Sequence, residues 1–251
     1  MLDTIKSELR KLLTIRSTYM IIGLNILLIV LMAFYIQGIR TGITVETSRT
    51  AFSDIAINAA LTCGTLSAII AILMLSHEYR YNTITYTLTA SRSRTKVLLA
   101  KIAVLSAFSI VYTLAMTALT LGMLYLGAVV VKGYTPVHQD FAVWDTLWRV
   151  CFYGWGNTMI GLLFTALIRN QVGAIVGFLI TPIVVEQLLG FLLRSNSIYL
   201  PFIALQRILS QEVPRSGQVA LTHASAALVV CIYLAVGWLI AWLLFLRRDA
   251  N

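Results

Sequence analysis

Six long stretches of the chain consist almost entirely of apolar residues, and this feature limits the possible folds more than any other. Each stretch has roughly the 20 residues that a helix needs to cross the hydrocarbon core of a bilayer. The runs show no period-two alternation, which a transmembrane β-barrel requires. In hydrocarbon, every backbone N–H and C=O must be paired within its own segment or within a closed barrel. We therefore predict an all-α integral membrane protein with about six transmembrane helices, near residues 18–38, 54–76, 97–131, 147–168, 172–193 and 221–246.

The composition agrees with hydrocarbon as the main solvent of the protein. Of the 251 residues, 59% are hydrophobic and only 12% are charged, which is about half of the charged share of soluble domains. So few charges cannot cover the surface of a water-soluble protein of this size. We expect a single transmembrane domain over 1–251 and no separate soluble domain.

The net charge of +9 comes from basic residues at the ends of the apolar runs. Cytoplasmic loops of membrane proteins carry an excess of Lys and Arg, so we take this charge as a sign of topology and expect no nucleic-acid partner. With a cytoplasmic N-terminus, 12 of the 19 basic residues fall in the cytoplasm, and the reverse orientation would leave only the other seven there. The twelve are Lys6, Arg10, Lys11, Arg16, Arg80, Arg92, Arg94, Lys96, Lys101, Arg169, Arg247 and Arg248. We predict a multi-pass protein of the cell membrane with both termini cytoplasmic.

The N-terminal segment, 1–17, predicts an amphipathic helix. Its apolar residues recur at steps of three and four, with Ile5, Leu9 and Leu12 at the centre of the apolar side. A helix of this kind lies in the membrane interface, with its apolar side in the acyl boundary and its Lys and Arg toward anionic head groups. The lipid bilayer is therefore an expected partner, and an ordinary basic anchor beside the first span is the alternative.

The segment 77–96, a cytoplasmic loop between the second and third predicted spans, mixes one acid with several bases and aromatic residues. Aromatic and Arg side chains are favoured at protein interfaces, so this composition suits docking onto another protein. The alternative is a loop that serves topology only. The candidate docking residues are Glu78, Tyr79, Arg80, Thr83, Arg94 and, just beyond the loop, Lys101.

On the opposite side of the membrane, the segment 194–220 is too apolar for a free loop, and we predict an extracytoplasmic re-entrant segment between the last two spans. Glu186 lies inside the fifth span, four residues after Pro182. A carboxyl at membrane depth usually faces the bundle interior or water, so we predict a pathway or gate role for Glu186 and Pro182, with Arg194 as a candidate partner. The alternative is a side chain that reaches the outer interface. Asn25 and Asn157, inside other spans, are expected to hydrogen-bond between helices.

Around the loop the chain resembles the ABC-2 type permeases, the membrane-spanning subunits of ATP-binding-cassette transporters. The similar residues are Glu78-Tyr79-Arg80 followed by Asn82-Thr83-Ile84, where members commonly have Glu-x-x-x-Gly-Thr, and Ser91-Arg92-Ser93-Arg94 with Lys96 and Lys101, where members often have Pro-x-x-Arg and a Lys. The order of elements is also similar: a basic amphipathic helix, six spans, and a re-entrant segment between the last two. Asn82 stands in place of the usual Gly, and Ser91 in place of the usual Pro.

The resemblance implies that 77–96 is a coupling loop that inserts into a groove on a separate cytoplasmic ATP-binding subunit, which would bind ATP and Mg. It also implies a second permease copy or a related permease, and an exporter as the function. The apolar spans favour an amphiphilic or lipophilic substrate.

Motifs for catalysis are absent from the sequence. It has no G-x-x-x-x-G-K-[ST], no H-E-x-x-H and no G-x-S-x-G, and its three Cys and three His show no metal-ligand spacing. We therefore expect no catalytic residue, no metal site and no cofactor in this chain, and not an enzyme. An integral membrane enzyme, an ATP-independent carrier and a membrane-anchoring scaffold are the alternative functions.

Overall fold

The computed structural model describes residues 2–39, 45–81, 94–132, 143–210 and 221–247, and all regular structure within these ranges is helical. The long helices are α2 (Arg16–Ile39), α3 (Val45–Arg80), α5 (Arg94–Lys132), α6 (Val143–Ile168) and α10 (His223–Arg247). The shorter elements are α1 (Leu2–Thr14), α7 (Gln171–Ile180), the π-helix η1 (Thr181–Val185), α8 (Glu186–Leu193), the 3₁₀-helix η2 (Arg194–Tyr199) and α9 (Pro201–Leu209).

Five helical segments are long and apolar enough to cross a membrane, and a sixth is added if α1 and α2, which are bent by 58° at their junction, form one span. These findings confirm the predicted all-α membrane fold with about six spans. The helix α5 has 39 residues, which at 1.5 Å per residue is about 58 Å long and exceeds the ~30 Å hydrocarbon core. The third predicted span therefore continues well beyond the bilayer or crosses it at a tilt.

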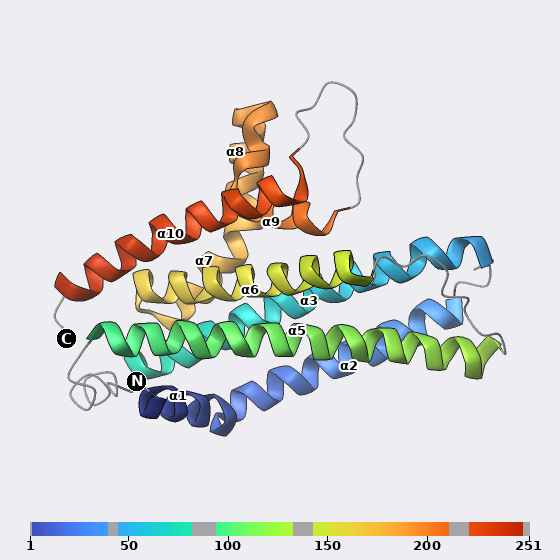
Figure 1. The fold of residues 1–251 in the computed structure, drawn as a ribbon, viewed down its shortest axis with the longest axis horizontal. Coiled ribbons are helices and arrows are strands. Elements are labelled where there is room, and N and C mark those ends of the chain that lie inside the picture. The colour runs from blue at the N-terminus through green and yellow to red at the C-terminus, as the bar shows by residue number, and fades with distance from the viewer. Residues whose placement is uncertain (1, 40–44, 82–93, 133–142, 211–220, 248–251) are drawn as a thin grey trace.

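The helices α2, α3, α5 and α6 run side by side along the long axis of the molecule (Figure 1). The helix α3 is central, since it packs against α2, α5 and α6. The start of α1, the end of α3, the start of α5 and the end of α10 all lie at one end of this axis (Figure 1). Segments predicted to be cytoplasmic are thus gathered at the same end.

Small residues let α3 and α6 approach closely. A Cβ added to Gly161 of α6 would lie 2.8 Å from the backbone oxygen of Ala68 in α3. Ala68 is itself fully buried. Close backbone approach through small residues is the usual packing mode of helices in membranes, where lipid removes most of the hydrophobic driving force for association.

The helix α7 packs against α6 and α3, and the chain beyond it, η1 and α8, stands away from the bundle (Figure 1). Pro182 lacks the N–H that an α-helix needs at this point, and the chain forms the π-helical turn η1 there instead of breaking. Beyond this turn most apolar side chains are exposed, with Phe191 at 87% and Leu192 at 78%. The interruption predicted at Pro182 is therefore a widened turn within a continuing helical segment.

The described part of the predicted re-entrant segment folds back onto the bundle. After η2, the helix α9 packs against α6 and α10 and buries Phe202, Leu205, Ile208 and Leu209. Leu205 fits against Gly156 of α6, where an added Cβ would lie 2.7 Å from Leu205 Cδ1. Residues 211–220, the rest of that segment, lie outside the described residues.

The Gly161–Ala68 contact generates a prediction about packing. Because a backbone atom cannot move aside cheaply, Gly161→Ala should lower the free energy of unfolding by about 1–3 kcal/mol. Thermal unfolding of the purified protein in nanodiscs measures this loss. Gly122→Ala in α5 is the matched control, since nothing lies within 4 Å of a Cβ there. Equal melting temperatures for the two variants would contradict the packing of α3 on α6.

Candidate functional site

The N-terminal helix α1 packs one face into the protein and leaves side chains outside that face exposed. Successive residues are about 100° apart around a helix, so Ile5, Glu8 and Leu12 fall within about 60° of one another. This face packs into the protein: Leu12 is 1% exposed, Glu8 is 0% exposed and Ile5 packs against the core. Leu9 and Lys6 are exposed outside this face.

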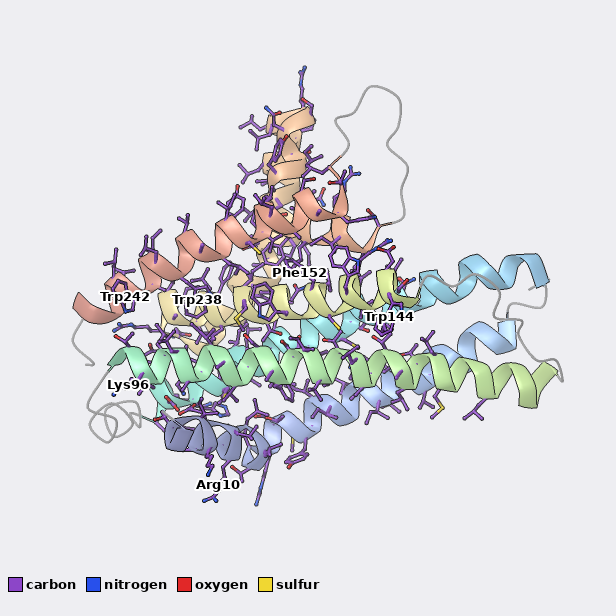
Figure 2. The ribbon with its side chains drawn as sticks, in the orientation of Figure 1. Arg10, Lys96, Trp144, Phe152, Trp238 and Trp242 are labelled. Carbon is purple, nitrogen blue, oxygen red and sulfur yellow. The ribbon has the colours of Figure 1, made fainter. Side chains whose placement is uncertain are left out.

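This arrangement differs from the sequence prediction, in which Ile5, Leu9 and Leu12 formed one lipid-facing side. The structure buries Leu12 in protein and leaves Leu9 44% exposed, with Leu13 beside it at 52%. Arg10 points away from the bundle (Figure 2). The apolar residues are thus divided between a protein contact and an outward face, which together with the outward bases suits a helix at the membrane interface.

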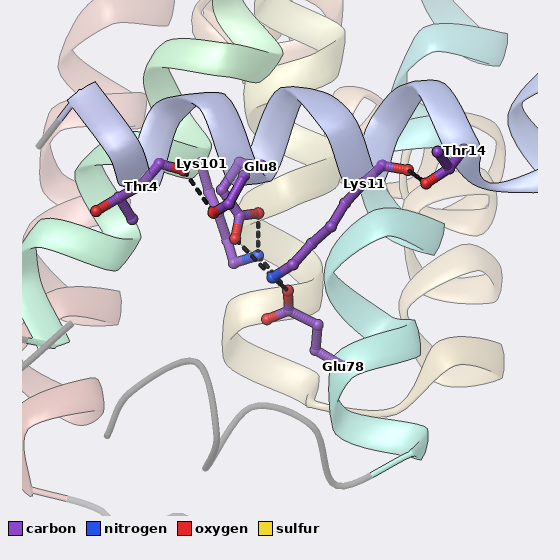
Figure 3. Close-up of polar contacts among 7 residues, drawn as sticks. Thr4, Glu8, Lys11, Thr14, Glu78 and Lys101 are labelled. Carbon is purple, nitrogen blue, oxygen red and sulfur yellow. Dashed lines mark hydrogen bonds and ion pairs between the residues drawn. The ribbon is translucent and has the colours of Figure 1, made fainter. Parts of the chain in front are cut away.

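Four charged side chains from three helices meet at the predicted cytoplasmic end, and we call this set the charged corner: Glu8 and Lys11 of α1, Glu78 of α3 and Lys101 of α5 (Figure 3). The ammonium of Lys101 lies 2.6 Å from Glu8 Oε2 and 2.7 Å from Glu78 Oε1. The ammonium of Lys11 lies 2.8 Å from Glu8 Oε1 and 2.8 Å from the same oxygen of Glu78. Each Lys therefore binds both carboxylates.

The charged corner is buried and its charges balance. Glu8, Lys101 and Glu78 are 0%, 2% and 5% exposed, whereas the Lys11 side chain is 37% exposed. Burial opposes the charge of Lys11, but hydrogen bonds to Glu78 and Glu8 outweigh it, so the pKa of the Lys11 ammonium lies above its ordinary value. Two carboxylates with two ammonium groups avoid an isolated buried charge, which would cost several kcal/mol.

The structure brings together two of the six predicted docking residues, Glu78 and Lys101, and adds two partners from α1 that the sequence reasoning missed. Glu8 shares a face with Ile5 and Leu12, and that spacing is a signal which could have found it. Glu78 is thus engaged within the chain, so its replacement should disturb α1 as well as any docking surface.

The other predicted docking residues lie around the charged corner. Arg80 and Tyr81 are exposed at the end of α3, with the Arg80 guanidinium 5.7 Å from the Tyr81 ring centroid. The Tyr79 ring lies under the guanidinium of Arg169, also at 5.7 Å. Thr83 and the side chain of Arg94 lie outside the described residues.

Away from the charged corner, Glu186 binds the start of α9. Its two carboxylate oxygens accept hydrogen bonds from the backbone N–H groups of Phe202 and Ile203, both at 2.8 Å, and the side chain is 2% exposed. A carboxylate there satisfies N–H groups that have no partner within the helix and interacts favourably with the helix dipole. Within the part of the chain that the structure describes, Glu186 forms no ion pair with Arg194, the candidate partner named from the sequence.

Metal binding finds no support in the described ranges. No group of three or more His, Cys, Asp or Glu side chains there is placed to hold a metal ion. The charged corner has only two carboxylates, and both are occupied by Lys.

Comparison with known protein families places most of the chain in one of them. A family model described as ABC-2 family transporter protein matches residues 4–193, or 190 of the 251 residues. The matched region includes all four residues of the charged corner, and also Pro182 and Glu186. No curated protein matches the chain.

The charged corner predicts a rescue experiment. Lys101→Met leaves two buried carboxylates with one ammonium, and we expect a loss of about 3–5 kcal/mol in unfolding free energy. The double variant Glu8→Gln/Lys101→Met keeps Lys11 balanced by Glu78 and should regain most of this loss. Thermal unfolding in nanodiscs measures both, with Lys6→Met, an exposed change on α1, as control. If Lys101→Met melts like Lys6→Met, the ion pairs do not hold α1 in place.

The contact between Glu186 and α9 generates a prediction: replacing Glu186 should detach α9 from its packed position. Glu186→Ala leaves one buried and one partly buried N–H group without an acceptor, at about 1–3 kcal/mol for the buried one, whereas Glu186→Gln keeps one acceptor oxygen. In a background without native cysteines, Ala204→Cys, at a fully buried position of α9, should react with an impermeant thiol reagent only when Glu186 is Ala. Gln206→Cys is exposed and should react in every background. Equal labelling of Ala204→Cys with and without Glu186 would refute this role.

Proposed function

The chain belongs to the ABC-2 family of transporter proteins, and we propose that it is the permease subunit of an exporter driven by an ATP-binding subunit on a separate chain. Membership of this family makes the chain a membrane-spanning component of an ABC transporter. In our proposal ATP and Mg²⁺ bind to the partner. This division is supported by the sequence, which contains no G-x-x-x-x-G-K-[ST] loop to cradle nucleotide phosphates.

The charged corner is the observation that carries this proposal. It joins the end of α3, the start of α5 and the inner face of α1 through contacts of 2.6–2.8 Å. A force applied to the segment between α3 and α5 would therefore move three helices together, as a rigid unit. Such rigid-body movement is a common way to pass nucleotide-driven closure to a distant site.

Docking, in this proposal, uses the residues around the charged corner more than the corner itself. Glu78 and Lys101 brace the site from within, while Arg80 and Tyr81 face outward. An exposed guanidinium beside an exposed aromatic ring is a favoured combination at protein interfaces. Segment 82–93, which includes Thr83, connects these residues to Arg94 and completes the proposed contact.

The remaining parts of the proposal concern the pathway. A second copy of the chain or a related permease would complete the transport path, with an amphiphilic or lipophilic cargo suited to the apolar spans. Glu186 and Pro182 would act as a gate through α9, because Glu186 holds the start of that helix. The protein would lie in the cell membrane with both termini cytoplasmic.

Arg80→Ala separates docking from folding. Arg80 is exposed, so the variant should express and melt like wild type, yet lose the ATP-binding subunit. Truncating one partner of a charged interface contact costs about 2–5 kcal/mol, which corresponds to roughly 30-fold to several-thousand-fold weaker binding. Co-purification and ATP hydrolysis of the complex measure the effect, while the chain alone should hydrolyse no ATP. Arg10→Ala, on the outward face of α1, is the control.

Full retention of the ATP-binding subunit by Arg80→Ala would contradict the docking site. ATP turnover by the isolated chain, abolished by a change within it, would contradict the division of labour.

The proposed orientation predicts which loops are accessible from outside. In a background without native cysteines, single cysteines at Gln139 and Ser216 should react with an impermeant thiol reagent in intact cells. A cysteine at Ser91 should react only after the membrane is permeabilised, because the bulk of the basic residues lie on its side. Labelling of Ser91 in intact cells, with Gln139 and Ser216 silent, would invert the topology.

A further inference from the structure

The helix α1 carries two leucines and two bases side by side on its exposed surface. Leu9, Leu13, Lys6 and Arg10 are all exposed. At about 100° per residue, these four side chains follow one another within about 100° of the helix circumference. We call them the outward arc, and it adjoins the face that α1 packs into the protein.

The leucines of the outward arc continue into an apolar surface at the start of α2. The Tyr19 hydroxyl donates a hydrogen bond to the Leu13 carbonyl, so the two helices are joined at their 58° bend. Tyr19 and Met20 are exposed on α2. Tyr is enriched where a span enters the head-group region, because its ring is apolar and its hydroxyl is polar. Leu9 and Leu13 therefore lie at the depth where head groups meet acyl chains.

The bases of the outward arc lie one helical turn apart, at i and i+4, where like charges repel each other. Glu8, the acid of the buried face, already binds Lys11 and Lys101. An anion between Lys6 and Arg10 would replace this repulsion by attraction. A phosphate suits the pair, because a guanidinium binds it through two parallel hydrogen bonds and an ammonium adds a compact charge.

The surroundings of these bases fit a phosphate that belongs to the bilayer. Long Lys and Arg stems lie along apolar surface while their charged ends extend to the head groups, and Arg10 points away from the bundle (Figure 2). The leucines beside the bases offer acyl-chain contact, which a free phosphate cannot use. The start of α1 lies at the end of the molecule predicted to be cytoplasmic (Figure 1), and the cytoplasmic leaflet carries the anionic lipids.

We propose that the outward arc binds an anionic phospholipid, with its two bases on the phosphate and its two leucines against the acyl chains. The charged corner presents this site, since its contacts of 2.6–2.8 Å fix the rotation of α1 that turns the outward arc away from the protein. A bound lipid would in turn hold α1 against α3 and α5. This contact needs no ATP-binding subunit, so it goes beyond the proposed function.

The test measures which lipid surrounds α1 in the isolated chain. In a background without native cysteines, Leu9→Cys carries a bimane fluorophore, and phosphatidylcholine nanodiscs contain increasing amounts of brominated phosphatidylglycerol or brominated phosphatidylcholine. We expect brominated phosphatidylglycerol to quench at lower content, with a preference of up to roughly 30-fold, since each base near an anionic surface contributes about fivefold. Lys6→Gln/Arg10→Gln should lose this preference and, because both side chains are exposed, melt like wild type in phosphatidylcholine alone.

Control variants separate this site from the net charge of the protein. Lys6→Arg/Arg10→Lys exchanges the two bases and should keep the preference. Arg80→Gln/Lys96→Gln removes two other exposed bases and should keep it as well, and Asp3→Asn, which makes α1 more positive, should not lower it. If Arg80→Gln/Lys96→Gln lost as much as Lys6→Gln/Arg10→Gln, net charge alone would attract the lipid and the site would be refuted.

The wild-type chain decides the question even if a variant folds poorly. Equal quenching by the two brominated lipids would overturn the proposal. Absence of quenching by either lipid would do the same, and would show that a second copy of the chain covers the outward arc. Inorganic phosphate, compared with chloride at equal ionic strength, should leave the preference unchanged, and loss of the preference would identify a site for free phosphate instead. The proposed function would stand in each of these cases, because no ATP-binding subunit takes part.

Discussion

Hydrocarbon offers no hydrogen-bonding partner, so a polar group inside this bundle is stable only where the protein supplies one. The backbone meets this condition through long helices, and the side chains meet it in small groups between helices. Asn25 of α2 donates to Tyr112 Oη of α5 at 2.6 Å and to Cys63 Sγ of α3 at 3.3 Å. Thr158 donates to Ser67 at 2.9 Å, joining α6 to α3. These contacts, the charged corner and Glu186 link the helices that lipid alone would leave separate.

The charged corner meets the same condition for four full charges, because each of them has a partner of opposite sign within the protein. Replacing a buried ion pair by well-packed apolar residues is often neutral or stabilising, so these charges are poor candidates for raising stability in general. Their effect is to fix the position of α1 relative to the bundle. Glu8 reaches Lys101 only in one rotation of α1, because a one-residue shift turns the side chain by about 100°. The pairing therefore fixes which face of α1 meets the protein, and with it the direction of Arg10 (Figure 2).

The sequence predicted the spans well because the cost of placing polar residues in hydrocarbon acts on each segment separately. It also identified Glu186, as a charge inside a span, and Glu78 and Lys101, through the composition of the loop and the resemblance to ABC-2 permeases. It did not predict their partners. Lys101 and Glu8 are 93 positions apart, and no local pattern encodes such a pairing. Glu186 binds backbone N–H groups, which every residue but proline carries, so the identity of its partner residues gives no sign of the contact.

Of the two asparagines expected to join helices, Asn25 does so, while Asn157 donates to the Tyr153 carbonyl of its own helix.

The contacts at the charged corner and at Glu186 suggest how a movement of α3 would spread. At the charged corner, Glu78 is tied to α1 and α5 by contacts of 2.8 and 2.7 Å, so a displaced α3 would take both with it. The helix α6 packs along α3 and would follow. The α7–α8 segment is mostly exposed, and it has few packed side chains to resist or transmit such a shift. Its attachments are the buried side chains of Ala174 and Phe178 in α7, which packs against α6 and α3, and the Glu186 carboxylate, which binds the start of α9. Displacement of α6 would reach α9 directly, because Leu205 packs against Gly156, and the Glu186 carboxylate would carry the same shift from α9 to the start of α8.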